Sequence, residues 1–283
     1  MIDPLATANG SVATGLVMLR KWLLLLVLLL AAFTSHSAHS PHVTSTKKTL
    51  RVMTYNIHVG VGMDKKLDLQ RIADVINRER PDLVGLQEVD RGVKRTEGKD
   101  EILELARMTR MDYAYGHNLD YQGGQYGIAI LSRFLIQKID HQKYQNRVEA
   151  ERRGMLRVEV ELDGRRINFA TSHLDYQTSE GRLFEAEQLL RLLEGVKDPL
   201  IVVGDFNDEP MGSTYKLMVS RFDDAWTARR AKGEGLTYPA DNPVKRIDYI
   251  FYRKGSGIRV KKAWVVSTLA SDHLPVMSEL EIR

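Results

Sequence analysis

Cysteine is absent from the 283-residue sequence. Disulfide bonds therefore cannot contribute to stability, and an N-terminal lipoprotein anchor, which requires a cysteine, is excluded. A strong excess of one charge is also absent, because 41 Lys and Arg residues oppose 37 Asp and Glu residues and the formal net charge is +4. This small excess is spread along the chain rather than gathered in a basic arm, so it favours neither a nucleic-acid nor a membrane partner. Adjacent charges such as Arg152-Arg153 are interpreted as solvated surface.

The sequence also lacks an apolar run long enough for a comfortable membrane span. The run Trp22–Phe33 has 12 residues, whereas a transmembrane helix needs about 20. The basic pair Arg20-Lys21 precedes it and small residues follow it, which is typical of a secretory signal peptide. We therefore expect 1–38 to be an N-terminal extension and signal peptide of an exported, periplasmic or secreted protein, with a membrane anchor as the alternative. A polar linker at 39–47 and one large domain at 48–283 are expected to follow.

Apolar periodicity predicts many short strands and a few helices. Helical stripes occur at Leu69–Ile76, ending before Arg80-Pro81, and at Leu183–Leu193, with Ser179 as a candidate N-cap. The predicted strands are Leu50–Thr54, Ile128–Leu131, Met155–Leu162, Ile167–Thr171, Leu200–Val203, Ile247–Phe251, Val260–Val266 and Val276–Ile282, with a further apolar run at Asp82–Leu86. This mixture predicts an α+β fold, a two-sheet sandwich covered by helices.

Polar side chains end or directly follow several of these apolar runs. They are Asn56, Glu88, His173, Asp205, Asn207, Asp248, Asp272 and His273. Because a rigid sheet can hold side chains from distant sequence positions around one site, we expect these residues to converge. Carboxylates, amides and imidazoles together are what metal-assisted attack on a phosphate ester needs. The sequence therefore predicts a site of that chemistry.

Each of these residues alone is a weak signal, because each also has a purely structural interpretation. A carboxylate at Glu88 is a good ligand for Mg²⁺ and equally an ordinary residue at a strand end. Asp205 and Asn207 project to the same side of an extended chain, so they can orient a water molecule and bind phosphate, or form an Asx-turn. Asp248 lies inside an apolar strand and needs a partner, for which a histidine ring is the natural candidate. His173 is as often an ordinary strand-edge histidine.

In their order along the chain, the motifs resemble those of the endonuclease/exonuclease/phosphatase superfamily. The resemblance covers roughly residues 48–283 and rests on Thr54-Tyr-Asn-Ile57, Leu86-Gln-Glu88, Ala129-Ile-Leu-Ser-Arg133, Thr171-Ser-His-Leu174, Gly204-Asp-Phe-Asn207, Arg246-Ile-Asp-Tyr249 and Ser271-Asp-His273. It implies a DNase I-like fold, a four-layer α/β sandwich with two packed mixed sheets flanked by helices. It also implies a hydrolase of phosphoric ester bonds that uses Mg²⁺, for which Mn²⁺ can substitute.

The resemblance implies a role for each residue that matches a family motif. Glu88 would be the principal Mg²⁺ ligand, with Asn56 and Asp272 at or beside the metal. Asp205 would orient or deprotonate the attacking water, and Asn207 would bind the scissile phosphate. These roles agree with the chemistry of the side chains, because a metal ion and fixed donors offset the charge that develops on phosphate oxygens.

Two imidazoles would complete this site. His273, aligned by Asp248, and His173 would stabilise the phosphorane-like state as cations and assist proton transfer. His173 stands where the abasic-site nucleases carry a tyrosine, and His58 stands where they carry a carboxylate. The Thr-x-His-Leu motif is instead similar to the sphingomyelinase, lipid-linked and general phosphodiesterase branches. The Gln-Glu-Val-Asp-Arg and His-Leu-Asp stretches resemble those of exported bacterial members grouped near the GPI-remodelling proteins.

Three interpretations of the function stay open at the level of the sequence. We expect a phosphodiesterase that acts on a lipid or small-molecule phosphoester. The alternative, a nonspecific secreted nuclease, should carry basic loops around the site, but Arg91–Arg95, Tyr121–Tyr126 and Thr237–Arg246 are only modestly basic. A catalytically silent module that binds a phosphorylated ligand should lack part of the site, and all of its residues are present. No obligate protein partner is expected, and the protein is expected to be a monomer.

Overall fold

The structure, a computed structural model, describes residues 48–146, 151–197, 199–229 and 231–283. These residues belong to the compact unit Lys47–Arg283. The expected signal peptide at 1–38 and linker at 39–47 lie outside the described residues. Within the described ranges, no helix is long and apolar enough to cross a membrane.

The described residues form two six-stranded mixed sheets. One has the order β11-β12-β1-β2-β4-β3 and the other β5-β6-β7-β8-β10-β9. The strands are β1 (Lys48–Asn56), β2 (Leu83–Arg91), β3 (Asp112–Tyr121), β4 (Gly124–Ser132), β5 (Ile136–Lys143), β6 (Gly154–Leu162), β7 (Arg165–His173), β8 (Leu200–Asp205), β9 (Phe222–Asp224), β10 (Asp248–Arg253), β11 (Ile258–Val265) and β12 (Val276–Ile282). The helices are α2 (Leu69–Glu79), α3 (Glu101–Thr109), α4 (Ser179–Leu193), α5 (Ser213–Arg221), α6 (Ala225–Arg229) and the 3-10 turns η1 (His58–Gly60) and η2 (Lys94–Thr96).

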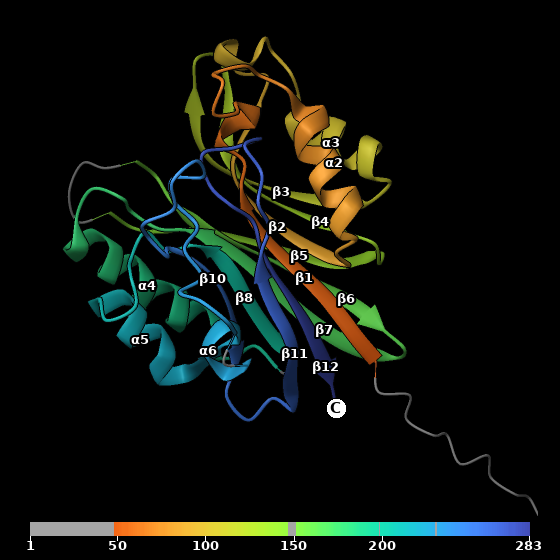
Figure 1. Cartoon of the computed structure of the whole chain (residues 1–283), viewed down its shortest axis with the longest axis vertical. Helices are drawn as coiled ribbons and strands as arrows, with labels where there is room; N and C mark the ends of the chain where they lie inside the picture. The colour runs from red at the N-terminus through yellow and green to blue at the C-terminus, as the bar shows by residue number, and fades with distance from the viewer. Residues whose placement is uncertain (1–47, 147–150, 198, 230) are drawn as a thin grey trace, which may run out of the picture. The chain divides into compact units, whose positions relative to one another are not determined.

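The sheets pack face to face, with helices on their outer faces (Figure 1). Because successive strand residues point to opposite faces, Val52 of β1 packs between the sheets and Met53 packs outward with α2 and α3. In the second sheet, Ile201 of β8 packs between the sheets and Val202 packs outward with α4 and α5. This four-layer arrangement confirms the α+β sandwich that the sequence predicts.

The two sheets approach closely at Gly85 of β2. A Cβ atom there would lie 2.4 Å from Val203 Cγ2 and 2.7 Å from Thr171 Oγ1 of the second sheet. Two residues further along β2, the Gln87 Nε2 group donates a hydrogen bond to the same Thr171 Oγ1 at 2.8 Å. A buried polar link therefore joins the sheets beside the strand ends.

The predicted helices and central strands are present, with shifted ends. Asp68 caps α2 by accepting hydrogen bonds from two backbone N–H groups, and Arg80 ends it in a left-handed conformation. The N-cap of α4 is Thr178, one residue before the predicted Ser179, because the Thr178 side chain accepts from Gly181 N. The strands that the sequence analysis does not predict, β3, β5 and β9, are all edge strands. Edge strands have one hydrogen-bonded neighbour and carry polar residues, so their apolar pattern is weak.

Candidate active site

Three of the predicted site residues lie side by side at strand ends of the second sheet. His173 of β7 is the register partner of Asp205 of β8, and Asp248 of β10 is its partner on the other side. Gly204 makes this possible, because a Cβ atom there would lie 2.0 Å from Ser172 O. Only glycine lets the backbones come so close. The strand register therefore places one carboxylate between an imidazole and a second carboxylate.

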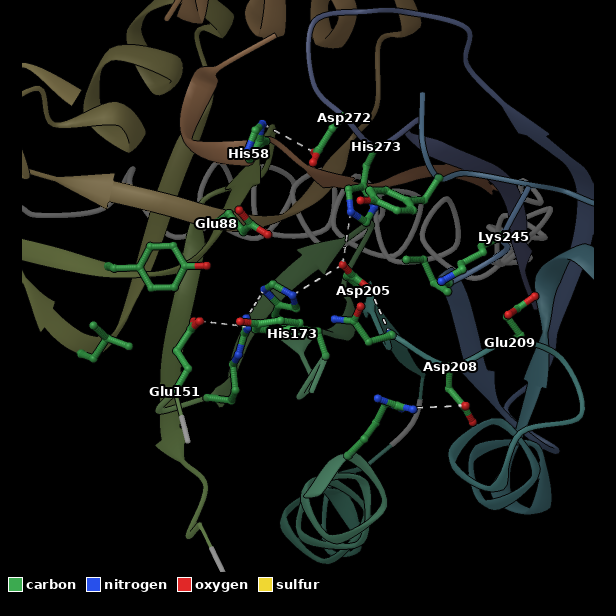
Figure 2. A pocket seen from close by; sticks show the side chains of 18 of the residues that line it. His58, Glu88, Glu151, His173, Asp205, Asp208, Glu209, Lys245, Asp272 and His273 are labelled. Atoms are coloured by element: carbon green, nitrogen blue, oxygen red, sulfur yellow. Dashed lines mark hydrogen bonds and ion pairs between the residues drawn. The ribbon is translucent and has the colours of Figure 1, made fainter. Parts of the chain in front are cut away.

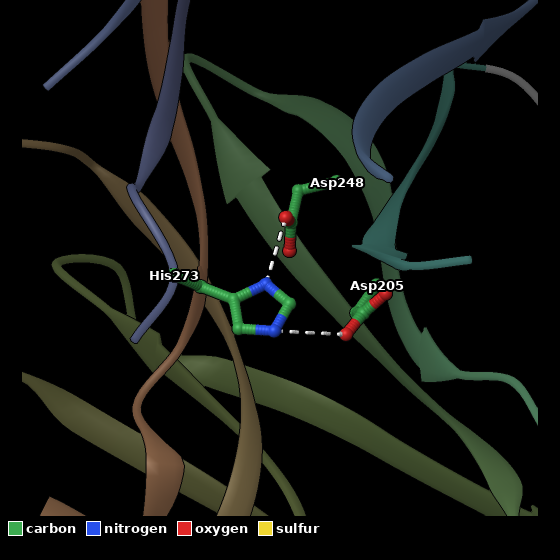
Figure 3. A group of neighbouring side chains, drawn as sticks. All are labelled: Asp205, Asp248 and His273. Carbon is green, nitrogen blue, oxygen red and sulfur yellow. Dashed lines mark hydrogen bonds and ion pairs between the residues drawn. The ribbon is translucent and has the colours of Figure 1, made fainter. Parts of the chain in front are cut away.

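A fourth residue, His273, comes from the first sheet and completes a row that consists of His173, Asp205, Asp248 and His273. It lies in the loop before β12, where the Ser271 hydroxyl donates a hydrogen bond to Asn56 O at 2.8 Å and so ties the loop to the end of β1. His273 Nδ1 lies 3.0 Å from Asp248 Oδ2, and His273 Nε2 lies 3.7 Å from Asp205 Oδ2 (Figure 3). The prediction that a histidine ring is the partner of buried Asp248 is confirmed.

Burial and neighbouring charges set the protonation of this row. Burial alone would lower the pKa of His273, but the carboxylates of Asp248 and Asp205 outweigh it and raise the pKa to about 10. The ring is therefore protonated at neutral pH and carries hydrogen on both nitrogens. Nδ1 donates to Asp248, whereas Nε2 faces Asp205 at an ion-pair distance. Burial, followed by the charge of Asp248, raises the pKa of Asp205 to about 7, against the opposing effect of His273. A carboxylate of this kind is suited to accept a proton near neutral pH.

His173 lies in the row but differs in charge from the expectation. Its Nε2 is 3.5 Å from Asp205 Oδ2. Burial, together with the charges of Arg153 and His273, lowers the pKa of His173 well below its usual value. The expectation of two cationic imidazoles is therefore wrong for His173, because protonation of a buried ring beside a guanidinium is unfavourable. The site combines one cationic and one neutral imidazole.

A β-bulge aims Glu88 at the same row. The register of β2 against β4 shifts between Leu86 and Val89, and Glu88 has a φ of 57°. Bulges of this kind turn a side chain out of the regular pattern. Glu88 Oε1 accepts a hydrogen bond from Asn56 Nδ2 at 2.9 Å, and the same amide group donates to Asp205 Oδ2 at 3.1 Å. Asn56 thus bridges a carboxylate of the first sheet to one of the second.

Asn207 and Asp272 border the row. The Asn207 backbone N–H donates to Asp205 Oδ1 at 2.9 Å, so the turn that was the structural alternative is present, and the side chain also lines the site cavity. Asp272 Oδ1 lies 3.7 Å from His58 Nδ1. The structure thus brings all the predicted residues together, with Asn56 and Asp248 behind the cavity wall.

The cavity in front of this row has a volume of about 760 Å³. Figure 2 shows Glu88, His173, Asp205 and His273 gathered around it. Its other lining residues are His58, Arg95, Leu119, Tyr121, Tyr126, Glu151, Arg153, Tyr176, Arg182, Asn207, Asp208, Glu209, Tyr238, Lys245, Ile247 and Asp272. Each of the three loop segments expected around the site, Arg91–Arg95, Tyr121–Tyr126 and Thr237–Arg246, therefore contributes residues to the cavity wall.

The donors around the cavity fit a divalent metal ion. Mg²⁺ prefers one or two carboxylates together with water and phosphate oxygens, and Glu88 and Asp272 supply carboxylates at the cavity wall. Among the described residues, Asp205, Asp248 and His273 also hold ligand atoms within 4.8 Å of one another. That row suits a hard cation less well, because protonated His273 has no lone pair to offer. The chemistry of the donors therefore favours Glu88 and Asp272 as ligands.

Arg153 is the main residue of the site that the sequence interpretation missed. The interpretation of the pair Arg152-Arg153 as solvated surface holds for Arg152, which is exposed. It is wrong for Arg153, which is 2% exposed and borders the cavity. Its guanidinium contacts His173 Nδ1, and its Nη2 lies 3.2 Å from Glu151 Oε2. Strand register is the signal that could have found it, because Gly154, the next residue, pairs with His173.

Comparison with known sequences identifies the family to which this arrangement belongs. The sequence profile of the Endonuclease/Exonuclease/phosphatase family matches residues 53–273. The chain belongs to this family. Its members generally hydrolyse phosphoester bonds, and they typically depend on a divalent metal ion.

Proteins of similar sequence or structure match most of the chain. The uncharacterized protein YbhP of Escherichia coli (strain K12) is 31% identical over 257 residues, which cover 83% of this chain and 97% of YbhP. A functionally unknown conserved protein from Enterococcus faecalis V583 is similar in structure, with a TM-score of 0.71, 20% identity and coverage of 83% of this chain and 100% of that one. The mannosyl-6-phosphatase Bt3783 of Bacteroides thetaiotaomicron VPI-5482 has a TM-score of 0.67, 20% identity and coverage of 82% and 99%. These structural likenesses show the fold.

Proposed function

We propose that this protein is a Mg²⁺-dependent hydrolase of small, polar phosphoesters, diesters in particular, and that it acts outside the cytoplasm. The observation that carries the proposal is the position of Asp205, a buried carboxylate with a pKa of about 7 between a neutral and a protonated imidazole. Membership of the family supports phosphoester chemistry. The signal-like segment 18–38 supports export.

Asp205 is placed to accept a proton from the attacking water. As the water oxygen bonds to phosphorus, its proton passes to the carboxylate, which is suited to hold it near neutral pH. The bond between phosphorus and the ester oxygen breaks in the same reaction, and the leaving alcohol takes its proton from solvent. Protonated His273, aligned by Asp248, donates to a phosphoryl oxygen that gains negative charge. His173 donates a hydrogen bond to the phosphoryl group from the other side of Asp205. Preorganised donors of this kind commonly supply the largest part of the catalytic effect.

Glu88 and Asp272 would hold Mg²⁺ at the wall of the cavity. When bound there, the ion would supply a positive charge that polarises the phosphoryl group and offsets charge on its oxygens. Asn56 keeps the metal-binding side and the proton-transfer side in a fixed relation, because its amide group donates to both Glu88 and Asp205. Both halves of the site therefore depend on one buried amide.

The wall of the cavity favours a small polar substrate over a lipid. Leu119 and Ile247 are the only aliphatic side chains among its twenty described lining residues. The rest are charged or polar or are tyrosines, which present an apolar ring face together with a hydroxyl. An acyl chain would find little apolar surface there. A polar leaving group with a ring can both stack and form hydrogen bonds.

The cations of the wall are less suited to a nucleic-acid backbone. Phosphate contacts from arginine and lysine dominate such binding. The arginines that line the cavity are already paired with carboxylates, Arg153 with Glu151 at 3.2 Å and Arg182 with Asp208 at 3.8 Å. Arg95 pairs with a buried aspartate at 2.8 Å. Their charge is partly compensated, which supports a small substrate over DNA.

A panel of substrates tests the proposal. Purified protein should be assayed with and without Mg²⁺ on bis-p-nitrophenyl phosphate, p-nitrophenyl phosphate, sugar phosphates, inositol phosphates, sphingomyelin, lysophospholipids and plasmid DNA. We expect hydrolysis that requires a divalent ion, with kcat/KM highest for small polar esters. A higher kcat/KM for DNA or for lipid would overturn the substrate assignment, and folded protein without activity on any ester would overturn the function.

A pair of matched variants links any activity to this site. Asp205→Asn removes the proposed base and should reduce kcat by about 10²- to 10⁴-fold. Asp74→Asn makes the same chemical change at an exposed position on α2 and should leave kcat unchanged. Equal activity of both variants would mean that the measured hydrolysis comes from another site or from a contaminating enzyme.

A further inference from the structure

Arg153 is a buried cation that the proposed steps do not use. It immediately precedes β6, and its carbonyl accepts a hydrogen bond from Tyr144 N at 2.9 Å. The next residue, Gly154, pairs with His173 across β6 and β7. This register brings the guanidinium against the His173 ring, with 2% of Arg153 exposed. A charged side chain so deeply buried is costly unless its partners are fixed.

The contacts of Arg153 determine where His173 carries its hydrogen atom. A guanidinium has only donors and stays charged at any relevant pH. Because it contacts His173 Nδ1, that nitrogen must accept and cannot carry hydrogen. The hydrogen of the neutral ring is therefore on Nε2, which faces Asp205 Oδ2 at 3.5 Å.

We propose that Arg153 is a positioning residue that locks His173 in the tautomer with hydrogen on Nε2, so that a neutral imidazole always presents a donor to the phosphoryl group. The contact with a cation also polarises the ring and makes its Nε2–H a stronger donor. The consequence for turnover rests on the proposed function, whereas the tautomer itself does not.

A purely structural role makes a different prediction. Arg153 also pairs with Glu151, so it could serve only to compensate a partly buried carboxylate. In that case the removal of Arg153 would impair folding or leave the Glu151 carboxylate without its ion pair, and it would leave the His173 tautomer unchanged. The tautomer is therefore the readout that separates the two roles.

Nuclear magnetic resonance of ¹⁵N-histidine-labelled protein measures this readout directly and needs no substrate. The chain has 8 histidines, and the signals of His173 are those that disappear in His173→Gln. We expect hydrogen on Nε2 and none on Nδ1 in the wild type. Arg153→Met should give the other tautomer or a mixture, whereas Arg153→Lys, which retains a cationic donor, should keep the original one. The neighbouring exposed Arg152→Met is the matched control and should leave the spectrum unchanged.

Two outcomes would overturn the proposal. One is a wild-type His173 with hydrogen on Nδ1, a result that requires no variant. The other is a folded Arg153→Met protein in which the tautomer is the same as in the wild type. If Arg153→Met does not fold, the double variant Arg153→Met/Glu151→Gln removes both charges of the ion pair and permits the same comparison.

Kinetics then test the effect on turnover. Arg153→Met should lower kcat by about 10²- to 10⁴-fold with a small change in KM, in line with the loss of a histidine's orienting partner. In a His173→Ala background the same change should have an effect of less than about twofold, because residues that act through one another are not additive. Full additivity would contradict an action through His173. A protein with the expected tautomer but no phosphoesterase activity would contradict the proposed function and leave the tautomer assignment standing.

Discussion

Replacing Glu101 with glutamine should change how the stability of the protein depends on pH. Glu101, the first residue of α3, is fully buried, and its Oε2 accepts a hydrogen bond from Asp90 N at 2.7 Å. Its Oε1 has no hydrogen-bond partner among the residues that the structure describes. Burial therefore raises the pKa of Glu101 from 4.5 to about 8. The bond to Asp90 supports the segment that follows the Glu88 bulge.

The sign and size of the effect follow from this pKa. Between pH 4.5 and about 8 the folded protein keeps a proton that the unfolded chain has released, so stability falls as the pH rises. The contribution is complete below pH 4.5 and is lost as the pH passes the folded-state value. At about 1.4 kcal/mol for each pH unit, the full loss would be roughly 5 kcal/mol. We expect a few kcal/mol, because relaxation around a buried carboxylate reduces the penalty.

Urea unfolding of the wild type and of Glu101→Gln, from about pH 5 to pH 9, measures this loss. The variant should be no more stable than the wild type at pH 5 and more stable at pH 9. Glu185 titrates in the same range, because burial raises its pKa to about 7. The difference between the two proteins isolates Glu101, and Glu185→Gln gives the separate contribution of the second carboxyl. Parallel pH profiles of the wild type and Glu101→Gln would refute the reasoning.

Three further predictions concern the site and the N-terminus. Asp248→Asn should lower kcat by about 10²- to 10⁴-fold with little change in KM, because alignment of His273 matters mainly in the transition state; steady-state kinetics check this, and an unchanged kcat would contradict it. Glu88→Gln should preserve the melting temperature while raising the Mg²⁺ concentration needed for half-maximal activity, and an unchanged Mg²⁺ dependence would remove Glu88 from the metal site. If Trp22–Phe33 is part of a signal peptide, N-terminal sequencing of exported protein should begin between about residues 35 and 41, whereas an intact membrane-bound chain would favour an anchor.

Most of the fold can be predicted from the sequence because its central strands are buried on both faces. Strands such as β8 are short apolar runs that end in a polar residue, and that combination marks both the strand and the site. The edge strands β3 and β5 lack this signal, because exposed and half-exposed polar residues interrupt their apolar residues. The helices α3 and α5 have nine residues each, so their apolar stripes are too short to stand out.

The positions of the site residues can be predicted better than their charges. A polar residue at a strand end indicates where a side chain lies, and Asp248 indicates that it needs a partner. The neutral state of His173 follows from its burial and from the charge of Arg153, and Arg153 reaches the ring only through the register of β6 against β7. Local sequence does not reveal that register. The Tyr176 and Arg182 contributions to the cavity also depend on how the start of α4 packs, which local patterns do not specify.

The close contact at Gly85 means that packing of the hydrophobic core determines the distance between the two halves of the site. Glu88, Asp272 and His273 are carried by one sheet, whereas His173 and Asp205 are carried by the other. The smallest possible side chain at Gly85 would already overlap Val203, so adding one methyl group would force the sheets apart near the strand ends. Each half would keep its own internal geometry while the gap between the proposed metal ligands and the proposed proton-transfer residues widened. The distance between the two halves of the proposed site is thus set by packing volume at a residue that is not itself part of that site.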